Sequence, residues 1–232
     1  MYYTNTNYIL CMIPAFLLTM LAQIWVSSTY KKWLKVQNSV NMPGGDAAQR
    51  ILAQANLQDV DIKLVQGQLT DHYDPKSNTL GLSQQVAQVP SVASLAIAAH
   101  EIGHAAQNHE GYGPLKLRSA LVPMVNIGSY LGWTLLAIGL ALQSLELAGV
   151  GLIVFSVGAV FALATLPVEI NASKRARQLL TDSGLVSSAE EMSGVSSVLN
   201  AAAFTYVAGL ATAVMQLLYF GSMVAGLGRR RS

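Results

Sequence analysis

The sequence predicts a mainly α-helical membrane protein, with about four transmembrane helices and one small α+β domain. Of its 232 residues, 52% are hydrophobic and only 11% are charged, which is too apolar for an ordinary soluble domain. Four uncharged stretches are long enough to cross the roughly 30 Å hydrocarbon core of a bilayer. Between the first and the second lies a polar segment with short apolar–polar alternations, which can fold as the α+β domain.

The composition also limits the possible functions. The net charge is +2 and the basic residues form short clusters rather than a stripe, so nucleic-acid binding is not expected. Cys11 is the single cysteine, which excludes a disulfide within the chain and a metal site built from thiolates. Any metal site must therefore use histidine and carboxylate ligands.

Residues 1–30 are predicted to be an N-terminal transmembrane anchor. Tyr8 to Val26 contains 19 residues without a charge. No positive segment precedes it and no small-x-small site follows it before Lys31, so a retained anchor is favoured over a cleaved signal peptide. Because Lys31, Lys32 and Lys35 follow directly, the positive-inside rule places the N-terminus outside and the next domain in the cytoplasm.

Residues 31–118 are predicted to form this cytosolic α+β domain. Residues 46–55 have the apolar period of a helix, and residues 60–65 alternate as a strand does. Residues 68–83 read as two strands joined by a Pro/Ser/Asn turn. An alanine-rich helix is expected to begin just after Pro90.

Residues 119–167 are predicted to be a transmembrane hairpin. Its two spans, residues 120–142 and 147–166, are separated by a short loop that contains Glu146. Both flanks are basic and the loop is acidic, so both flanks should face the cytoplasm, in agreement with the first span. The basic residues are Lys116 and Arg118 before the hairpin and Lys174, Arg175 and Arg177 after it.

Two further helices are expected after the hairpin. The first helix has Pro167 in its first turn and is closed by Asp182 to Gly184; residues 168–198 form the segment after the hairpin. Ser188 to Glu191 is a capping box for the next helix, which continues into an apolar segment within residues 199–232. If this segment crosses the membrane, the basic tail Arg229–Arg231 lies outside against the charge rule, so its topology stays open.

The chemistry of the chain is concentrated in the motif His100-Glu101-Ile102-Gly103-His104. Four helical residues advance about 6 Å and turn about 400°, so the two histidines share one helix face. Two imidazoles in this arrangement can bind zinc, and Glu101 can reach a water on the metal and act as general base for attack on a peptide carbonyl. Gly103 lets another backbone pass close to this helix.

A catalytic zinc ion needs a third protein ligand. Gln107 and Glu110 stand where the metzincin pattern requires glycine and histidine, so that pattern does not match. His109 is expected to be a helix C-terminal histidine that interacts with the helix dipole. Glu169 is the only acidic residue between Glu146 and Asp182. From the residues alone, Glu169, His109 and the remaining acidic residues stay open as the third ligand.

Five segments give the chain a resemblance to the bacterial YugP-type neutral zinc metallopeptidases, membrane proteins distantly similar to HtpX-type and CAAX-prenyl endopeptidases. They follow one another through nearly the whole chain: residues 69–75, 100–107, 112–123, 166–173 and 198–208. The resemblance implies a zincin-like domain, one zinc ion per chain, and Glu169 as the third zinc ligand. It also implies that residues 70–74, which include Tyr73 and Asp74, lie along the substrate cleft.

One position departs from the pattern of the family. Asn171 stands where relatives typically have aspartate, so it could accept a hydrogen bond but would add no negative charge near the metal. Weaker metal binding is therefore expected. Further candidates for stabilising the site or the transition state are His72, Tyr112, Arg118 and Tyr206.

These features predict a multi-pass zinc endopeptidase of the bacterial plasma membrane, with its site on the cytoplasmic side. The expected partners are a protein or peptide substrate, such as a membrane or misfolded protein, and the lipid bilayer; the sequence carries no signal for an oligomeric state. The alternative is a non-catalytic membrane scaffold or regulatory protein with a structural zinc site. A transporter is disfavoured because the four apolar spans carry no ionisable residue along a pathway.

Overall fold

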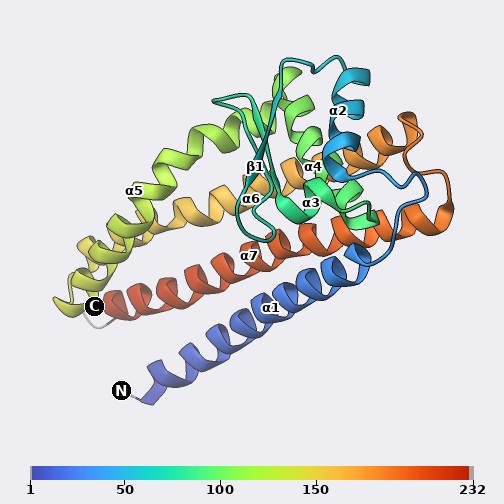
Figure 1. Cartoon of the computed structure of the whole chain (residues 1–232). Coiled ribbons are helices and arrows are strands. Elements are labelled where there is room, and N and C mark those ends of the chain that lie inside the picture. Colours follow the sequence, from blue (N-terminus) through green and yellow to red (C-terminus); the bar gives the residue numbers. More distant parts are fainter. Residues whose placement is uncertain (1, 230–232) are drawn as a thin grey trace. The chain divides into compact units, whose positions relative to one another are not determined.

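The computed structural model describes residues 2–229 and is mostly helical, with one small sheet (Figure 1). The chain divides into two compact units. The apolar unit falls within Met1–Ala22, Leu117–Leu166 and Thr205–Ser232, and the sheet unit comprises Gln23–Lys116 and Pro167–Phe204. The elements in chain order are α1 (Tyr2–Leu34), α2 (Gly44–Gln54), β1 (Asp61–Val65), β2 (His72–Asp74), β3 (Thr79–Ser83), α3 (Gln84–Gln88), α4 (Val92–His109), α5 (Gly113–Ala141), α6 (Leu145–Asp182) and α7 (Ala189–Arg229).

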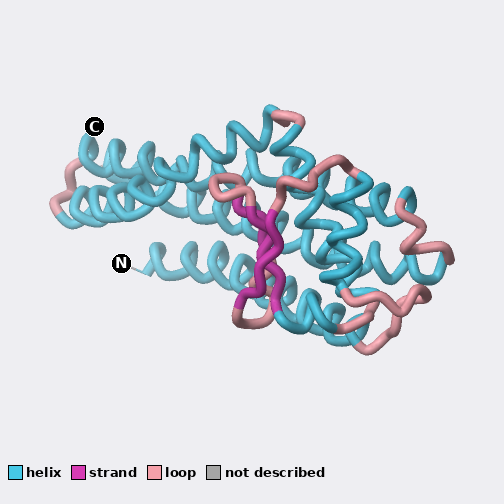
Figure 2. Tube along the Cα trace, turned by 45° about the horizontal axis from the view of Figure 1, so that its top comes forward, coloured by secondary structure: helices cyan, strands magenta, loops and turns pink. Residues whose placement is uncertain are grey.

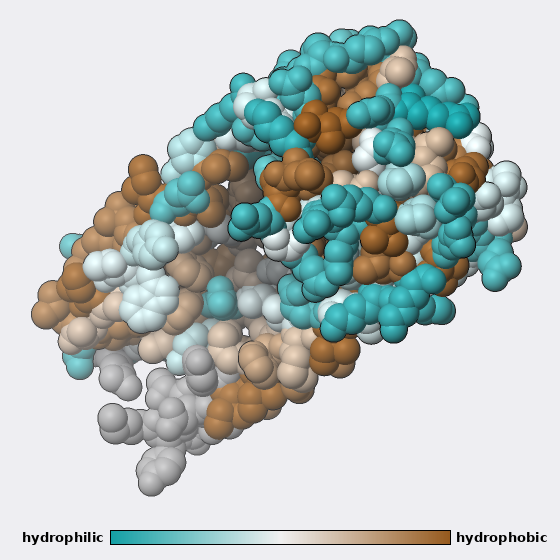
Figure 3. All heavy atoms as spheres, viewed as in Figure 1, coloured by the Kyte–Doolittle hydropathy of each residue, from teal (hydrophilic) through white to brown (hydrophobic). Residues whose placement is uncertain are grey.

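Four helices among the described residues are long and apolar enough to cross a membrane, in agreement with the predicted number of about four transmembrane helices. They are α1 from Ile9, α5, α6 and α7. Their large apolar side chains are strongly exposed, as at Ile127 (70%) and Ile153 (71%), and hydrophobic residues are frequent over α5 in Figure 3. A soluble protein rarely exposes so much contiguous apolar surface, so these helices indicate a membrane protein.

Glycines hold the predicted hairpin of α5 and α6 together within the apolar unit. A Cβ atom on Gly139 would overlap the backbone of Ala148, and one on Gly151 would overlap the backbone of Leu136. Lipid offers no hydrophobic driving force between helices, so close backbone approach through small residues is the usual way for them to associate.

The sheet unit contains a three-stranded sheet of order β1-β3-β2 (Figure 2). β3 is central, pairs in parallel with β1 and antiparallel with β2, and is buried along its whole length. The predicted turn between β2 and β3 is present, because Asp74 accepts hydrogen bonds from Lys76 N (3.0 Å) and Ser77 Oγ (2.6 Å). The fully buried side chains around the sheet and α4 include Ile51, Leu80, Leu82, Leu95, Ile102 and Leu180.

Helix α4 begins where the sequence predicts and crosses α6 at very close range. Ser91 caps it by accepting a hydrogen bond from Ser94 N at 3.1 Å. A Cβ atom on Gly103 would lie 2.7 Å from the carbonyl oxygen of Ala172 on α6, which is too close for any residue larger than glycine. The two helices therefore bring the segments around His104 and Glu169 together.

The structure corrects two details of the sequence analysis. Pro167 does not begin a helix: α6 runs through it, and Glu169 lies inside the helix. A proline removes a single backbone donor, and the long helix continues on either side of that loss. At the start of α7, Ser188 Oγ accepts from Glu191 N as predicted, but the Glu191 carboxylate accepts from Ser39 N and Ser39 Oγ. Helix α3 was not predicted, and Arg230 and Arg231 of the basic tail lie outside the described residues.

Candidate metal centre

The two histidines of the motif lie one turn apart on α4. Their ring centroids are 4.8 Å apart and the rings are nearly perpendicular, at 82°. His104 is buried and His100 is partly buried, because α4 is covered by other elements of the sheet unit along most of its length. The helical spacing alone places both imidazoles on one side of the helix.

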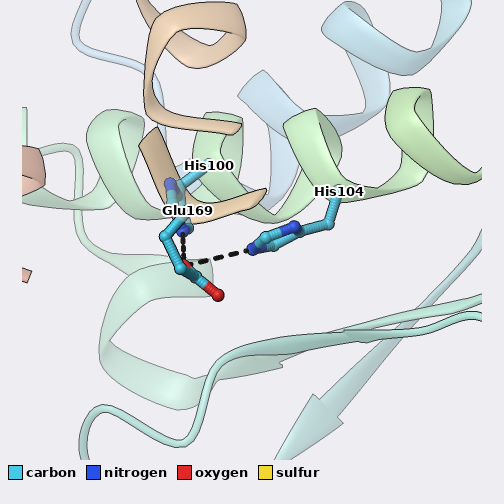
Figure 4. Close-up of side chains that lie close together, drawn as sticks. All are labelled: His100, His104 and Glu169. Carbon is cyan, nitrogen blue, oxygen red and sulfur yellow. Dashed lines mark hydrogen bonds and ion pairs between the residues drawn. The ribbon is translucent and has the colours of Figure 1, made fainter. Parts of the chain in front are cut away.

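Glu169 on α6 completes a group of three side chains that could hold a metal ion. Its Oε2 atom lies 3.3 Å from His100 Nε2 and 3.5 Å from His104 Nε2 (Figure 4). The three donor atoms all lie within 4.8 Å of one another, and Glu169 is only 1% exposed. This is the one such group of three or more histidine, cysteine or acidic residues in the described part of the chain.

The donor set fits zinc. Two imidazole nitrogens and one carboxylate oxygen form one of the ligand sets of catalytic zinc sites. Tetrahedral bonds of about 2.0–2.1 Å place neighbouring ligand atoms about 3.3–3.4 Å apart. The separations of Glu169 Oε2 from His100 Nε2 and His104 Nε2, 3.3 and 3.5 Å, are close to this spacing.

Glu101 lies beside this group and is held by the sheet. Its Oε2 atom accepts a hydrogen bond of 3.1 Å from the backbone N–H of Tyr73 on β2. Burial raises the pKa of the Glu101 carboxyl; the two histidines of the motif counteract this, and Glu169 and Asp71 add to it. A carboxyl group with a raised pKa is suited to accept and return protons near neutral pH.

Both histidines of the motif also use their second ring nitrogen. His104 Nδ1 lies 3.0 Å from Gln107 Oε1, and His100 Nδ1 lies 3.3 Å from Ser173 Oγ. Burial alone would lower the pKa of His104, but its hydrogen bond with Glu169 and the charge of Glu101 outweigh this, so the pKa is raised. The negative charge that favours a proton on the ring also favours a metal cation beside it.

The two remaining histidines, His72 and His109, lie outside the candidate metal centre. His72 is exposed on β2, where its Nδ1 lies 2.8 Å from Thr70 O and its ring packs over Gly81. His109 ends α4 and lines a separate cavity of about 230 Å³. Neither belongs to the group of three metal-binding residues.

The remaining candidates are Asn171, Tyr112, Arg118 and Tyr206. Asn171 Oδ1 accepts hydrogen bonds from Gln107 Nε2 (2.9 Å) and Arg175 Nε (2.7 Å). Tyr112 follows α4, and its backbone N–H donates to Gln107 O. Arg118 and Tyr206 belong to the apolar unit, so their roles remain predictions.

Sequence reasoning missed Gln107, Ser173 and the backbone of Tyr73. Helical spacing could have indicated the first two, because Gln107 follows His104 by three residues and Ser173 follows Glu169 by four. A backbone donor leaves no mark in the residue type, so the contact from Tyr73 could not have been found.

Comparison with known proteins shows the family of the chain. Residues 8–225 match the family described as "Putative neutral zinc metallopeptidase". The chain is 43% identical over 213 residues to the "Putative membrane protease YugP" of Bacillus subtilis (strain 168), covering 92% of this chain and 94% of that protein. No solved structure matches the chain. The match over nearly the whole length confirms the resemblance seen in the sequence motifs, and the chain belongs to the neutral zinc metallopeptidase family.

Proposed function

We propose that the chain is a membrane-embedded, zinc-dependent endopeptidase with a zincin-like site. The proposal rests above all on the convergence of His100, His104 and Glu169 beside the buried carboxyl group of Glu101. Membership of a zinc metallopeptidase family implies zinc, and the three donors provide for one ion per chain.

The side chains of the site have distinct roles in this proposal. His100 and His104 would hold the metal through Nε2 and Glu169 through its carboxylate. When bound, zinc would act as a Lewis acid that polarises the peptide carbonyl and lowers the pKa of water towards about 7. Glu101 would accept a proton from the attacking water at its carboxylate and later deliver it to the leaving amine.

The backbone of β2 positions Glu101 for this work. The N–H of Tyr73 donates to Glu101 Oε2 and restricts the rotation of the carboxylate. Tyr73 is itself held by hydrogen bonds from its hydroxyl to Asn78 Oδ1 (2.7 Å) and from Asn108 Nδ2 to its hydroxyl (3.0 Å). The edge strand β2 is also a surface along which an extended substrate backbone can pair.

The charges that flank the apolar helices support a site on the cytoplasmic side of the plasma membrane. Lys31, Lys32 and Lys35 follow the first span, and basic residues flank the hairpin on both sides. Glu169 follows the end of the predicted second hairpin span, Leu166, by only three residues. A site so near the end of a span suits membrane proteins or misfolded membrane proteins as substrates.

Replacing Glu101 tests the proposed mechanism. Glu101→Gln keeps the size and polarity of the side chain but removes its basicity. The variant should retain zinc, measured by elemental analysis, while cleavage of an unfolded labelled protein falls about 10²–10⁴-fold. Glu190→Gln, an exposed acid in the first turn of α7, is the matched control and should keep full activity. Undiminished cleavage by Glu101→Gln would rule out Glu101 as the base.

A hydroxamate chelator distinguishes the enzyme from a scaffold with a structural zinc site. Structural zinc is usually closed by four protein ligands, whereas the group in the described residues provides three. The enzyme should bind the hydroxamate only in its zinc-loaded form, measured by calorimetry. A zinc-loaded protein that ignores the chelator would support the scaffold.

A further inference from the structure

Gln107 connects the candidate metal ligand His104 to α6. It is fully buried on α4. Its Oε1 atom faces His104 Nδ1 at 3.0 Å, and its Nε2 atom donates to Val168 O (2.8 Å) and to Asn171 Oδ1 (2.9 Å). All the polar atoms of its side chain are therefore used.

The direction of these hydrogen bonds is fixed from the far end by Arg175. A guanidinium group can only donate, so the Asn171 atom that faces Arg175 Nε at 2.7 Å must be the carbonyl oxygen. Arg175 is held in place by two hydrogen bonds of 2.6 Å from NH1 and NH2 to the carboxylate of Glu110. Because the guanidinium group of Arg175 cannot accept a hydrogen bond, it fixes the orientation of the Asn171 amide.

The same reasoning fixes Gln107 and then His104. Because Asn171 Oδ1 and Val168 O are both acceptors, they must face the NH₂ group of Gln107, and the Gln107 oxygen must face His104. An oxygen acceptor at 3.0 Å requires that His104 Nδ1 carries a proton. The neutral ring then has its lone pair on Nε2, which is the atom that lies 3.5 Å from Glu169 Oε2.

We infer that Gln107 is a positioning residue that selects the His104 tautomer able to bind a metal through Nε2. The backbone carbonyl of Val168 and the side chain of Asn171, which Arg175 orients, set the orientation of Gln107. With this tautomer the Nε2 lone pair faces a carboxylate oxygen, an arrangement that is favourable only when a proton or a metal cation lies between the two atoms. The inference rests on the proposed zinc site for its purpose, but the tautomer itself is a property of the metal-free protein.

His100 provides an internal contrast. Its Nδ1 lies 3.3 Å from Ser173 Oγ, and a hydroxyl group can either donate or accept. Ser173 therefore imposes no tautomer on His100. The chain fixes the protonation of one ligand and leaves that of the other adjustable.

The tautomer can be observed by ¹⁵N NMR of the full, detergent-solubilised, metal-free chain labelled at histidine. The chain has 4 histidines, so each signal can be assigned by single substitution. At a pH where the ring is neutral, His104 should carry its proton on Nδ1. In Gln107→Met, which keeps the size but removes the acceptor, the proton should move towards Nε2, the position that imidazole side chains favour in water. Ser173→Ala and the exposed Gln178→Met are controls and should leave the His104 signals unchanged.

Zinc affinity gives a second readout that does not depend on activity. Loss of a hydrogen-bond partner of a metal-binding histidine typically weakens metal binding about 10–100-fold, so Gln107→Met should fall in this range. If Gln107→Met does not fold, the spectrum of the wild-type protein still decides the matter. A neutral wild-type His104 protonated on Nε2, or a Gln107→Met variant with unchanged tautomer and zinc affinity, would overturn the inference. Wild-type protein that has the Nδ1 tautomer but binds no zinc would instead refute the proposed function.

Discussion

Glu169 is a buried carboxylate that lies against both histidines of the motif. It is 1% exposed and its Oε2 atom faces the Nε2 atoms of both His100 and His104. Burying a charge is costly unless a partner compensates it, so this carboxylate needs the two imidazoles, and a cation between them is favourable. Glu169 thus supplies negative charge to the site, whereas the neighbouring amide side chains only orient His104.

The predictability of the site also differs from residue to residue. The spacing of His100 and His104 specifies a shared helix face, because helical geometry is local. Glu169 follows 65 residues after His104, and only the family resemblance separated it from His109. Gln107 and the Tyr73 N–H act through tertiary contacts with α6 and Glu101, so their roles could not be derived from local spacing alone.

Replacing Asn171 with aspartate should strengthen zinc binding. In Asn171→Asp, the carboxylate would still accept from Gln107 and Arg175 and would add a negative charge that favours the metal. Zinc affinity, measured by competition with a chromophoric chelator, should increase several-fold. Asn200→Asp is a matched control, since Asn200 also accepts a hydrogen bond from an arginine, Arg177, at 2.8 Å. Equal or weaker zinc binding by Asn171→Asp would contradict this view of the site.

At the level of elements, the crossing of α4 and α6 creates the site. Gly103 lies between the two histidines and against the Ala172 carbonyl, so the proposed ligands from the two helices meet only because this position lacks a side chain. The sequence predicted that another backbone passes close to Gly103, but not that this backbone belongs to α6. It also placed a helix boundary at Pro167, because local rules weigh proline heavily, whereas the packing of α6 on both sides of that residue keeps the helix continuous.

Gly103→Ala tests this crossing. The new methyl group would lie 2.7 Å from Ala172 O, so α4 and α6 must separate. Overpacking of this kind costs about 1–3 kcal/mol, and the metal-free protein should unfold at a lower temperature and bind zinc more weakly. Gly113→Ala is the control, because a Cβ atom there would meet nothing within 4 Å. Wild-type stability and zinc affinity in Gly103→Ala would show that the close crossing is unimportant for the site.

At the level of the whole molecule, the chain combines four apolar helices with a compact unit that contains the candidate metal ligands. The apolar helices could be predicted almost completely, since length and hydropathy decide them. The sheet could be predicted as three short strands, but not its order β1-β3-β2, because pairing between strands depends on contacts distant in sequence.

The charge pattern predicts which parts of the chain face the cytoplasm. In a Cys11→Ser background, which has no other cysteine, Glu146→Cys and Lys174→Cys introduce single thiols at exposed positions. A membrane-impermeant maleimide added to intact cells should label Glu146→Cys, and Lys174→Cys only after permeabilisation. The opposite labelling pattern would place the metal site outside the cell.

The most direct test of the account is the zinc content of the detergent-purified chain, wild type beside Glu169→Ala. The wild type should contain about one zinc ion per chain, and the variant should lose most of it, because a catalytic site needs three protein ligands. Gln178→Ala, at an exposed position of the same helix, serves as a control and should retain its zinc. Full retention of zinc by Glu169→Ala would show that the third ligand lies elsewhere, and a wild type without zinc would contradict the proposed metal centre altogether.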